Sequence, residues 1–218
     1  MIAIVDYDAG NIRSVLNALG RVGASDFVLT ADREQLRNAS HVILPGVGEA
    51  SCAMQALREA GLADFIPTLG QPVLGICVGA QLMCAGSEEG DTRCMGIFPA
   101  EVRRFRETPS EKVPHMGWNS LREPGLSSRA QSGDLSSPLF ACLKEGEYVY
   151  FVHSYYPELC ADTIAVANHG IDFSAALSHN NFYACQFHPE KSGRVGEQIL
   201  RNFLELRAAR YNFERLLK

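Results

Sequence analysis

The sequence lacks the hallmarks of several protein classes. Its seven cysteines are odd in number and form no CxxC pair, so neither zinc-ribbon spacing nor a secreted disulfide framework is expected. No apolar run approaches the roughly 20 residues that cross a bilayer. The stretch Met1–Asp6 has no basic segment before a long apolar one, so we expect no signal peptide. These absences predict a cytoplasmic protein with no membrane contact.

A strong excess of one charge is also missing. The net charge is −5 over 218 residues and no part of the chain is strongly basic, so we do not expect nucleic acid as a partner. The chain has no internal repeat and no low-complexity tract. Apolar residues make up 46% of it, enough for a full core, and the length suits a single α/β domain over residues 1–218.

Short apolar strands alternating with helices are what the first part of the sequence does contain. We expect strands at 2–5, 27–29, 41–44 and 72–76, and helices with one apolar face between them. This order predicts a doubly wound, mostly parallel sheet flanked by helices.

The second half is richer in strands. They are expected at 102–105, 148–152, 164–167, 175–177 and 183–187, with an exposed loop over 120–137 and a closing helix over 196–217. Because turns join these strands, we expect extra antiparallel strands in the C-terminal half.

Cys77 is the candidate nucleophile, because sheets of this kind bind ligands where their strands end and Cys77 follows the strand at 72–76. The segment Gly75–Gly79 has the form of a nucleophile elbow, in which flanking glycines give room for a sharp turn. A helix that starts at the thiol favours the thiolate and leaves the amide of Val78 free to bind an oxyanion. The other six cysteines are expected to be structural.

His188 is the candidate base among the six histidines. It follows the strand expected at 183–187, and Glu190 comes two residues later, on the same side of an extended segment. Glu190 can then fix the tautomer of His188 and stabilise the imidazolium, as the third member of a triad. Taken alone, His-Pro-Glu is a surface turn.

The loop Pro45-Gly46-Val47-Gly48 follows a buried strand. Two glycines allow its backbone N–H groups to turn inward and provide a second oxyanion donor. Taken alone, a plain strand-to-helix turn explains the loop equally well.

Together these segments resemble a known family. Gly75–Gln81 with His188-Pro189-Glu190 resembles a class I, triad-type glutamine amidotransferase, which implies a flavodoxin-like fold. Further stretches are similar to the glutaminase subunit of imidazole glycerol phosphate synthase, in the order found in that family: Asp6–Asn11, Leu44–Gly48, Pro114–Asn119, Tyr150–Tyr155 and Gln186–Ser192.

The resemblance implies a reaction and a partner. Cys77, His188 and Glu190 would hydrolyse L-glutamine to glutamate and ammonia, with no metal or organic cofactor. The partner would be a (β/α)8-barrel cyclase in a heterodimer. Ammonia would pass through it to a ribonucleotide intermediate of histidine biosynthesis, giving imidazole glycerol phosphate and an aminoimidazole carboxamide ribonucleotide.

The same resemblance assigns roles to further residues. Gln81 and Glu89 would hold the backbone of glutamine, with Glu89 on its α-ammonium group, and Val47 and Gly48 would line the substrate side. The positions near the cyclase interface would be Asn11, Trp118, Tyr155 and Lys191.

Plainer alternatives exist for three of the interface positions. Asn11 is also read as a helix N-cap, Trp118 as a core aromatic, and Lys191 as a solvated charge.

The sequence departs from the family pattern at a few positions. Val78 and Ala80 are smaller than the Leu and Met common there, and Glu49 stands where a small residue is usual. Val78 and Ala80 supply no reacting side chain, so the chemistry should survive.

Rival interpretations stay open as well. One is a glutaminase that serves an amidino-sugar or anthranilate-type synthase. Others are a non-catalytic regulatory protein on the same scaffold, against which the presence of the whole Cys-His-Glu set argues, and a cysteine peptidase, against which Gln81 and the His-Pro-Glu segment argue.

Overall fold

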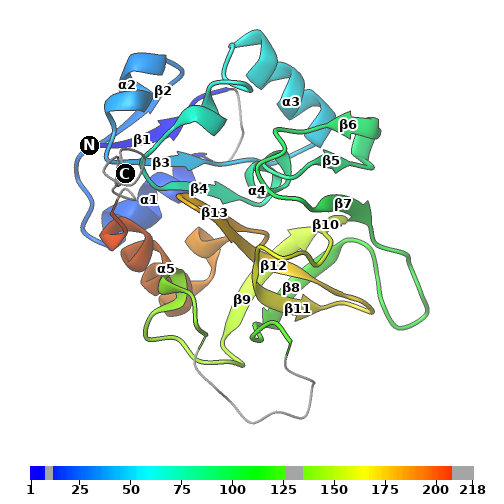
Figure 1. Ribbon diagram of the computed structural model, residues 1–218. Coiled ribbons are helices and arrows are strands. Elements are labelled where there is room, and N and C mark those ends of the chain that lie inside the picture. The colour runs from blue at the N-terminus through cyan, green and yellow to red at the C-terminus, as the bar shows by residue number, and fades with distance from the viewer. Residues whose placement is uncertain (8–11, 126–134, 208–218) are drawn as a thin grey trace, which may run out of the picture.

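A seven-stranded sheet forms the centre of the molecule in the computed structural model, which describes residues 1–7, 12–125 and 135–207 (Figure 1). Its strand order is β11-β12-β13-β4-β3-β1-β2. The parallel strands are β1 (Ile2–Val5), β2 (Phe27–Thr30), β3 (His41–Leu44), β4 (Val73–Ile76) and β13 (Phe182–Cys185). The antiparallel extension consists of β12 (Asp172–His179) and β11 (Thr163–Asn168). The expected doubly wound, mostly parallel sheet with antiparallel strands from the C-terminal half is confirmed.

Helices cover both faces of this sheet. Figure 1 shows α1 (Ile12–Arg21) and α5 (Gly193–Glu205) on one side, and α2 (Arg33–Asn38) and α3 (Ala50–Glu59) on the other. The short helix α4 (Val78–Leu82) follows β4 directly. Single turns of 3-10 helix lie at Ile66–Thr68, Glu89–Asp91, Pro138–Phe140 and Pro189–Lys191. Among the described residues, no helix combines the length and the apolar composition of a membrane span.

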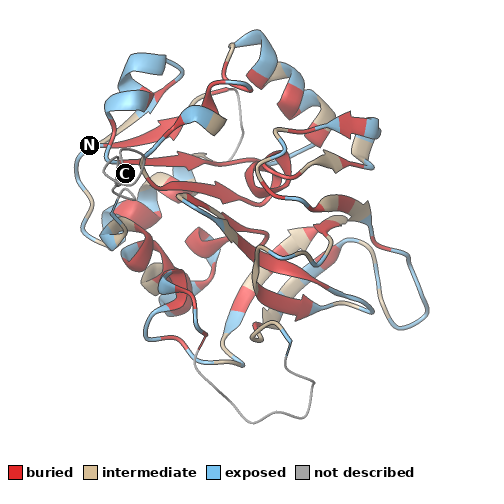
Figure 2. Ribbon diagram, viewed as in Figure 1, coloured by how far each residue is buried: buried red, intermediate tan, exposed pale blue. Residues whose placement is uncertain are grey.

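The core lies along the central strands. All four residues of β1, of β3 and of β4 are buried, which is why these strands read as continuous apolar runs (Figure 2). The helix α1 contributes Val15, Ala18 and Leu19, whose spacing places them on one helical face against the sheet.

Two smaller sheets lie beside the main one. The first has the order β10-β7-β5-β6 and consists of β5 (Gly86–Ser87), β6 (Thr92–Arg93), β7 (Glu101–Arg104) and β10 (Tyr155–Pro157). The second is the antiparallel pair β8 (His115–Ser120) and β9 (Tyr148–His153), in which His115 lies opposite His153.

The topology brings separate loops to one edge of the main sheet. In the parallel pair β4 and β13, Ile76 lies opposite Cys185, and in the pair β3 and β4, Leu44 lies opposite Gly75. The segments that follow these three strands therefore emerge side by side at their carboxyl ends, where such sheets bind ligands.

The structure corrects some of the expectations. The closing helix ends at Glu205 rather than 217, because the backbone becomes extended at Leu206; residues 208–218 lie outside the described part. The expected loop over 120–137 is wrong at its start, since Ser120 belongs to β8 and Arg122 bridges to Val166. The helix α2 was not expected; its N-cap is Asp32, whose carboxylate accepts a bond from Gln35 N at 2.8 Å.

Candidate active site

Cys77 occupies a sharp turn between β4 and α4. Its φ of 53° and ψ of −110° lie in a region that residues with a side chain rarely adopt. The neighbouring glycines make the turn possible. A Cβ on Gly75 would lie 2.9 Å from the backbone N of Ala80, and one on Gly79 would overlap the carbonyl oxygen of Leu44. The structure thus forms the predicted elbow, and its glycines are needed for close backbone approach.

The loop after β3 packs directly on this elbow. A Cβ on Gly46 would overlap the backbone N of Gly79, and the hydroxyl of Tyr7 donates to the carbonyl of Pro45 at 2.6 Å. Gly48 has a φ of +91°, which glycine adopts readily. These contacts hold the loop next to the first turn of α4. The first hydrogen bond of this helix runs from Gln81 N to Cys77 O at 3.1 Å. The amide of Val78 precedes this bond, so it has no partner within the helix.

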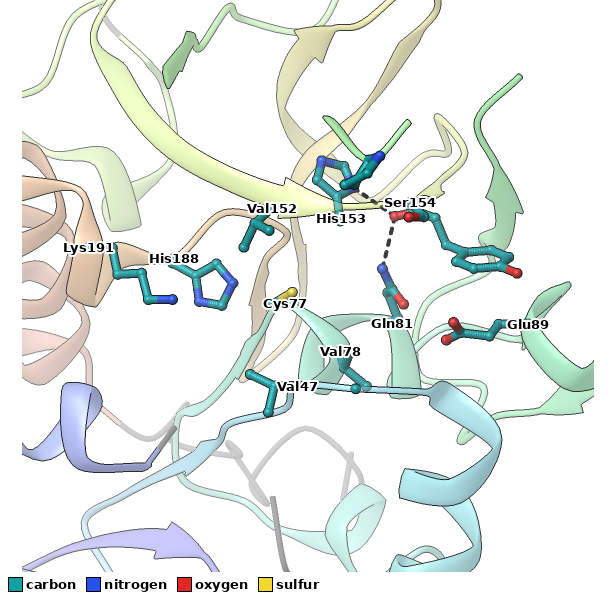
Figure 3. Close-up of a pocket in the computed structure, with 13 residues that line it drawn as sticks. Val47, Cys77, Val78, Gln81, Glu89, Val152, His153, Ser154, His188 and Lys191 are labelled. Carbon is teal, nitrogen blue, oxygen red and sulfur yellow. Dashed lines mark hydrogen bonds between the residues drawn. The ribbon is translucent and has the colours of Figure 1, made fainter. Parts of the chain in front are cut away.

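His188 and Glu190 lie beside Cys77, just after β13. The Nδ1 of His188 lies 2.7 Å from Oε1 of Glu190, and both side chains are almost fully buried. Figure 3 shows the His188 ring facing the sulfur of Cys77. Burial alone lowers the pKa of His188. Hydrogen bonds to Cys77 and Glu190, together with their negative charges, outweigh it and raise this pKa to about 9.

A pocket of about 320 Å³ opens over the sulfur of Cys77 (Figure 3). The residues of the sequence prediction that line it are Val47, Gly48, Cys77, Val78, Gln81, Glu89, Tyr155, His188 and Lys191. Glu190 does not line this pocket and is bonded to Nδ1 of His188. Trp118 is not a pocket residue, and at 55% exposure it is not a core aromatic either. Asn11 lies outside the described residues.

Glu89 reaches the pocket from the turn after β5 and is fixed by the start of α3. Its Oε2 accepts a hydrogen bond from the backbone N of Ala50 at 2.7 Å, because the side chain of Glu49 makes no capping bond there. Burial, with a contribution from Glu49, raises the pKa of Glu89 despite this bond. A partly buried carboxylate of this kind is suited to binding a cationic group.

Gln186 is a neighbour of the thiol that sequence reasoning did not single out. Its Nε2 donates to the sulfur of Cys77 at 3.7 Å, and its Oε1 accepts from Nε2 of Gln81 at 2.9 Å. The same Gln81 nitrogen donates to the carbonyl of Tyr155 at 3.0 Å. The signal for Gln186 was its spacing: it stands two residues before His188, directly after the buried strand β13.

His153 also lines the pocket, although the sequence pattern favoured only His188 among the six histidines. Its ring is buried, and burial lowers its pKa to about 3. The described residues contain no cluster of His, Cys, Asp and Glu side chains arranged to hold a metal ion. The pocket brings together the thiol of Cys77, the imidazole of His188 and the carboxylate of Glu89, and Glu190 is bonded to His188.

Comparison with known proteins agrees with this arrangement. Residues 3–206 match the sequence profile of the glutamine amidotransferase class-I family. The chain is 51% identical over 206 residues to the imidazole glycerol phosphate synthase subunit HisH of Bacteroides thetaiotaomicron, covering 94% of this chain and 99% of that protein. It is 46% identical over 208 residues to subunit HisH 2 of Legionella pneumophila, covering 94% and 98%.

Solved structures resemble the fold. A crystal structure of a glutamine amidotransferase has a TM-score of 0.68 and 20% identity, covering 94% of this chain and 98% of that one. A second glutamine amidotransferase, from Thermotoga maritima, has a TM-score of 0.64 and 16% identity, covering 94% and 96%. At these identities, the likeness bears on the fold alone.

Proposed function

Because the chain belongs to the class-I glutamine amidotransferase family, we propose that it is the glutaminase subunit of an imidazole glycerol phosphate synthase, an enzyme that hydrolyses L-glutamine to glutamate and ammonia. The observation that carries the proposal is the convergence of Cys77, His188 and Glu190 where β4 and β13 end, under one pocket. A thiol beside an imidazole that is itself held by a carboxylate is the arrangement of a nucleophilic triad.

The reaction begins with attack of the Cys77 sulfur on the amide carbon of glutamine. A His188 with a pKa of about 9 carries a proton at neutral pH, so it can protonate the departing ammonia. It then accepts a proton from the water that releases glutamate from the thioester. Glu190 keeps the imidazole oriented and stabilises its positive charge throughout.

The oxyanion that forms during attack needs hydrogen-bond donors. The amide of Val78 lies at the start of α4, and the Val47-Gly48 segment borders the same pocket. We propose that each provides one donor, and a single oxyanion donor contributes roughly 3 kcal/mol to lowering the barrier.

The far end of the pocket is suited to the amino-acid part of the substrate. Figure 3 shows Gln81 and Glu89 together on the side of Cys77 away from His188. The carboxylate of Glu89 matches the α-ammonium group of glutamine, and the amide of Gln81 matches its polar backbone.

A partner is proposed for the exposed face of the β8–β9 pair. Met116 and Trp118 on β8 are exposed, and Val152, which lies opposite Met116, lines the pocket. This apolar face is therefore continuous with the mouth of the site, as a surface that receives ammonia must be. We infer that the (β/α)8-barrel cyclase docks here, near Tyr155 and Lys191. The seven free thiols favour a reducing compartment, so we also infer a cytoplasmic location.

The proposal is tested by replacing the nucleophile. Cys77→Ala should lower glutamine hydrolysis at least about a thousandfold, because no other group can form the thioester. Hydrolysis is followed as glutamate release, and circular dichroism reports on the fold. The matched control is Cys52→Ala, which removes an exposed thiol on α3 and should retain activity. Hydrolysis at the wild-type rate in Cys77→Ala would contradict the proposal.

The acceptor is tested by adding the barrel cyclase. The wild-type pair should form imidazole glycerol phosphate from glutamine, whereas Cys77→Ala with the cyclase should form it only from added ammonium. Glutamine hydrolysis without any cyclase product would keep the glutaminase but reject this acceptor.

A further inference from the structure

A chain of hydrogen bonds leads from β8 toward the nucleophile, and its two histidines take no part in the mechanism above. On β8, Asn119 Nδ2 lies 3.2 Å from Nε2 of His115. His115 Nδ1 lies 2.9 Å from Nε2 of His153, its cross-strand neighbour on β9. His153 Nδ1 lies 2.7 Å from the carbonyl oxygen of Tyr155, to which Gln81 also bonds.

The direction of every bond in this chain follows from one group. The carbonyl of Tyr155 only accepts, so His153 carries its proton on Nδ1, and its Nε2 accepts in the neutral ring. His115 must then donate from Nδ1, which leaves its Nε2 to accept from the amide of Asn119. Burial lowers the pKa of His115 to about 4 and that of His153 to about 3, so both rings are neutral at physiological pH.

The same carbonyl determines two amide orientations in the active site. Gln81 must present its nitrogen to Tyr155 O, and that nitrogen also donates to Oε1 of Gln186. Gln186 is thereby left with its nitrogen toward the sulfur of Cys77. Figure 3 shows the oxygen of the Gln81 amide on the side of Glu89, where it is available as an acceptor in the pocket.

We propose that the His115–His153 pair is a positioning device for the glutaminase site, which holds the Tyr155 carbonyl and through it sets the amide orientations of Gln81 and Gln186. This inference rests on the proposed function. The hydrogen bonds of the two rings go to each other, to Asn119 and to Tyr155, and not to Cys77 or His188. Both act through Tyr155 on the residue that binds substrate and on the residue that donates to the thiol.

The surroundings of the pair show that packing alone does not require histidine. Phe105, Phe151 and Phe173 surround His153 with ring centroids 5.2 to 5.4 Å away. A phenyl ring would satisfy such an apolar shell at least as well, since a buried polar ring needs partners to compensate for its lost hydration. What a phenylalanine cannot do here is donate to Tyr155 O.

The test replaces one ring nitrogen at a time. His153→Asn places an amide N–H where Nδ1 stands, so it can still donate to Tyr155 O. His153→Gln places its amide where Nε2 stands, so it keeps the contact with His115 and loses the donation. His153→Phe loses both. The variants are measured as full chains with saturating barrel cyclase, by kcat and KM for glutamine, and by the rate of Cys77 alkylation by iodoacetamide, followed by mass spectrometry.

We expect His153→Phe to lower kcat/KM about tenfold, the factor that one oriented hydrogen bond commonly carries, with most of the change in KM because Gln81 lies on the substrate side. Alkylation of Cys77 should slow about threefold, since Gln186 no longer holds a fixed donor toward the sulfur. His153→Asn should recover most of both losses, and His153→Gln should not.

The ranking of the three variants by kcat/KM and by alkylation rate tests the proposal. If the histidine served packing alone, Phe would be the best substitute and the two amides would rank together. Equal kinetics of the Asn and Gln variants, or wild-type kinetics of the Phe variant, would overturn the proposal. If the Phe variant does not fold, the Asn and Gln pair carries the test by itself. If the wild-type chain hydrolyses no glutamine, the proposed function fails, while the alkylation rates still test the positioning of Gln186.

Discussion

Two buried histidines line the same pocket and have opposite acid–base behaviour. His188 is 2% exposed and His153 is 6% exposed, so both rings are out of water. The pKa of His188 is raised to about 9, whereas that of His153 is lowered to about 3. At neutral pH one ring is therefore protonated and the other is neutral.

The difference comes from the partners and not from burial. Burial lowers the pKa of both rings, because it disfavours the imidazolium. His188 bonds Glu190 and Cys77, whose negative charges more than compensate for this effect. His153 bonds a carbonyl and a second neutral ring. The carbonyl of Tyr155 raises the pKa of His153, but this effect does not outweigh burial. Negatively charged partners therefore keep His188 protonated at neutral pH, whereas uncharged partners leave His153 neutral.

Within this comparison of the histidines, the largest expected effect comes from removing the charge beside His188. Glu190→Gln keeps an oxygen that accepts from Nδ1 and removes the negative charge, so the pKa of His188 should fall from about 9. We expect kcat/KM to fall about a hundredfold or more, as when the acid of a triad is replaced by its amide. The fall in rate at high pH, which reports loss of the His188 proton, should move to lower pH.

A carboxylate on the next helix provides the matched control. Glu197 pairs with Arg21 at 2.8 Å and does not line the pocket, so Glu197→Gln should keep the wild-type rate and pH profile. An unchanged pH profile in Glu190→Gln would show that the carboxylate does not set the acidity of His188.

A second prediction tests the opposite pKa shifts of the two histidines through the pH dependence of stability. In the unfolded chain His153 takes a proton below its ordinary pKa of 6.5, whereas the folded ring does so only near 3, so its contribution is lost as pH falls through this range. Between pH 7 and 5 the loss for this one ring is about 2 kcal/mol. In His153→Phe, the drop in the free energy of unfolding over this interval should be smaller by that amount.

His188 should behave in the reverse sense. Its raised pKa stabilises the fold fully below 6.5, and this contribution is lost as pH rises toward 9. Wild type should therefore lose more stability than His188→Gln between pH 7 and 9. Urea unfolding followed by circular dichroism measures both intervals, and pH profiles that run parallel to wild type would contradict both assignments.

The sequence predicts the charged histidine more readily than the neutral one. His188 stands two residues from Glu190 and directly after a buried strand, so its partner is local and the pattern is visible. His153 is paired by β8, a strand that was not expected because Met116 and Trp118 are its only large apolar residues and Gly117 stands between them. Its partner His115 lies far along the chain, and only the register of the β8–β9 pair brings the two rings together.

In the rest of the site, too, local sequence patterns are predictable and contacts between distant segments are not. Gly75 and Gly79 predict the elbow, because backbone segments that approach this closely require glycine. The alternation of buried strands and helices likewise predicts the main sheet. Contacts made by side chains across distant segments, such as Gln186 with Gln81, have no local period and need the folded structure to be seen.

The smallest expected effect sharpens the comparison with a third buried histidine. His41 on β3 bonds the carbonyl of Leu206 at 2.9 Å, much as His153 bonds that of Tyr155, and burial lowers its pKa as well. It does not line the pocket. His41→Phe removes the bond to the Leu206 carbonyl and a second one, between Nδ1 and the Ser40 hydroxyl, and should lower the free energy of unfolding by about 1–2 kcal/mol. Because this carbonyl orients no group near Cys77, kcat and KM for glutamine should keep their wild-type values.

Urea unfolding and glutaminase assays on one preparation compare the effect on stability with the effect on activity. A loss of activity in His41→Phe as large as that in His153→Phe would mean that any buried histidine–carbonyl bond affects the site through general stability.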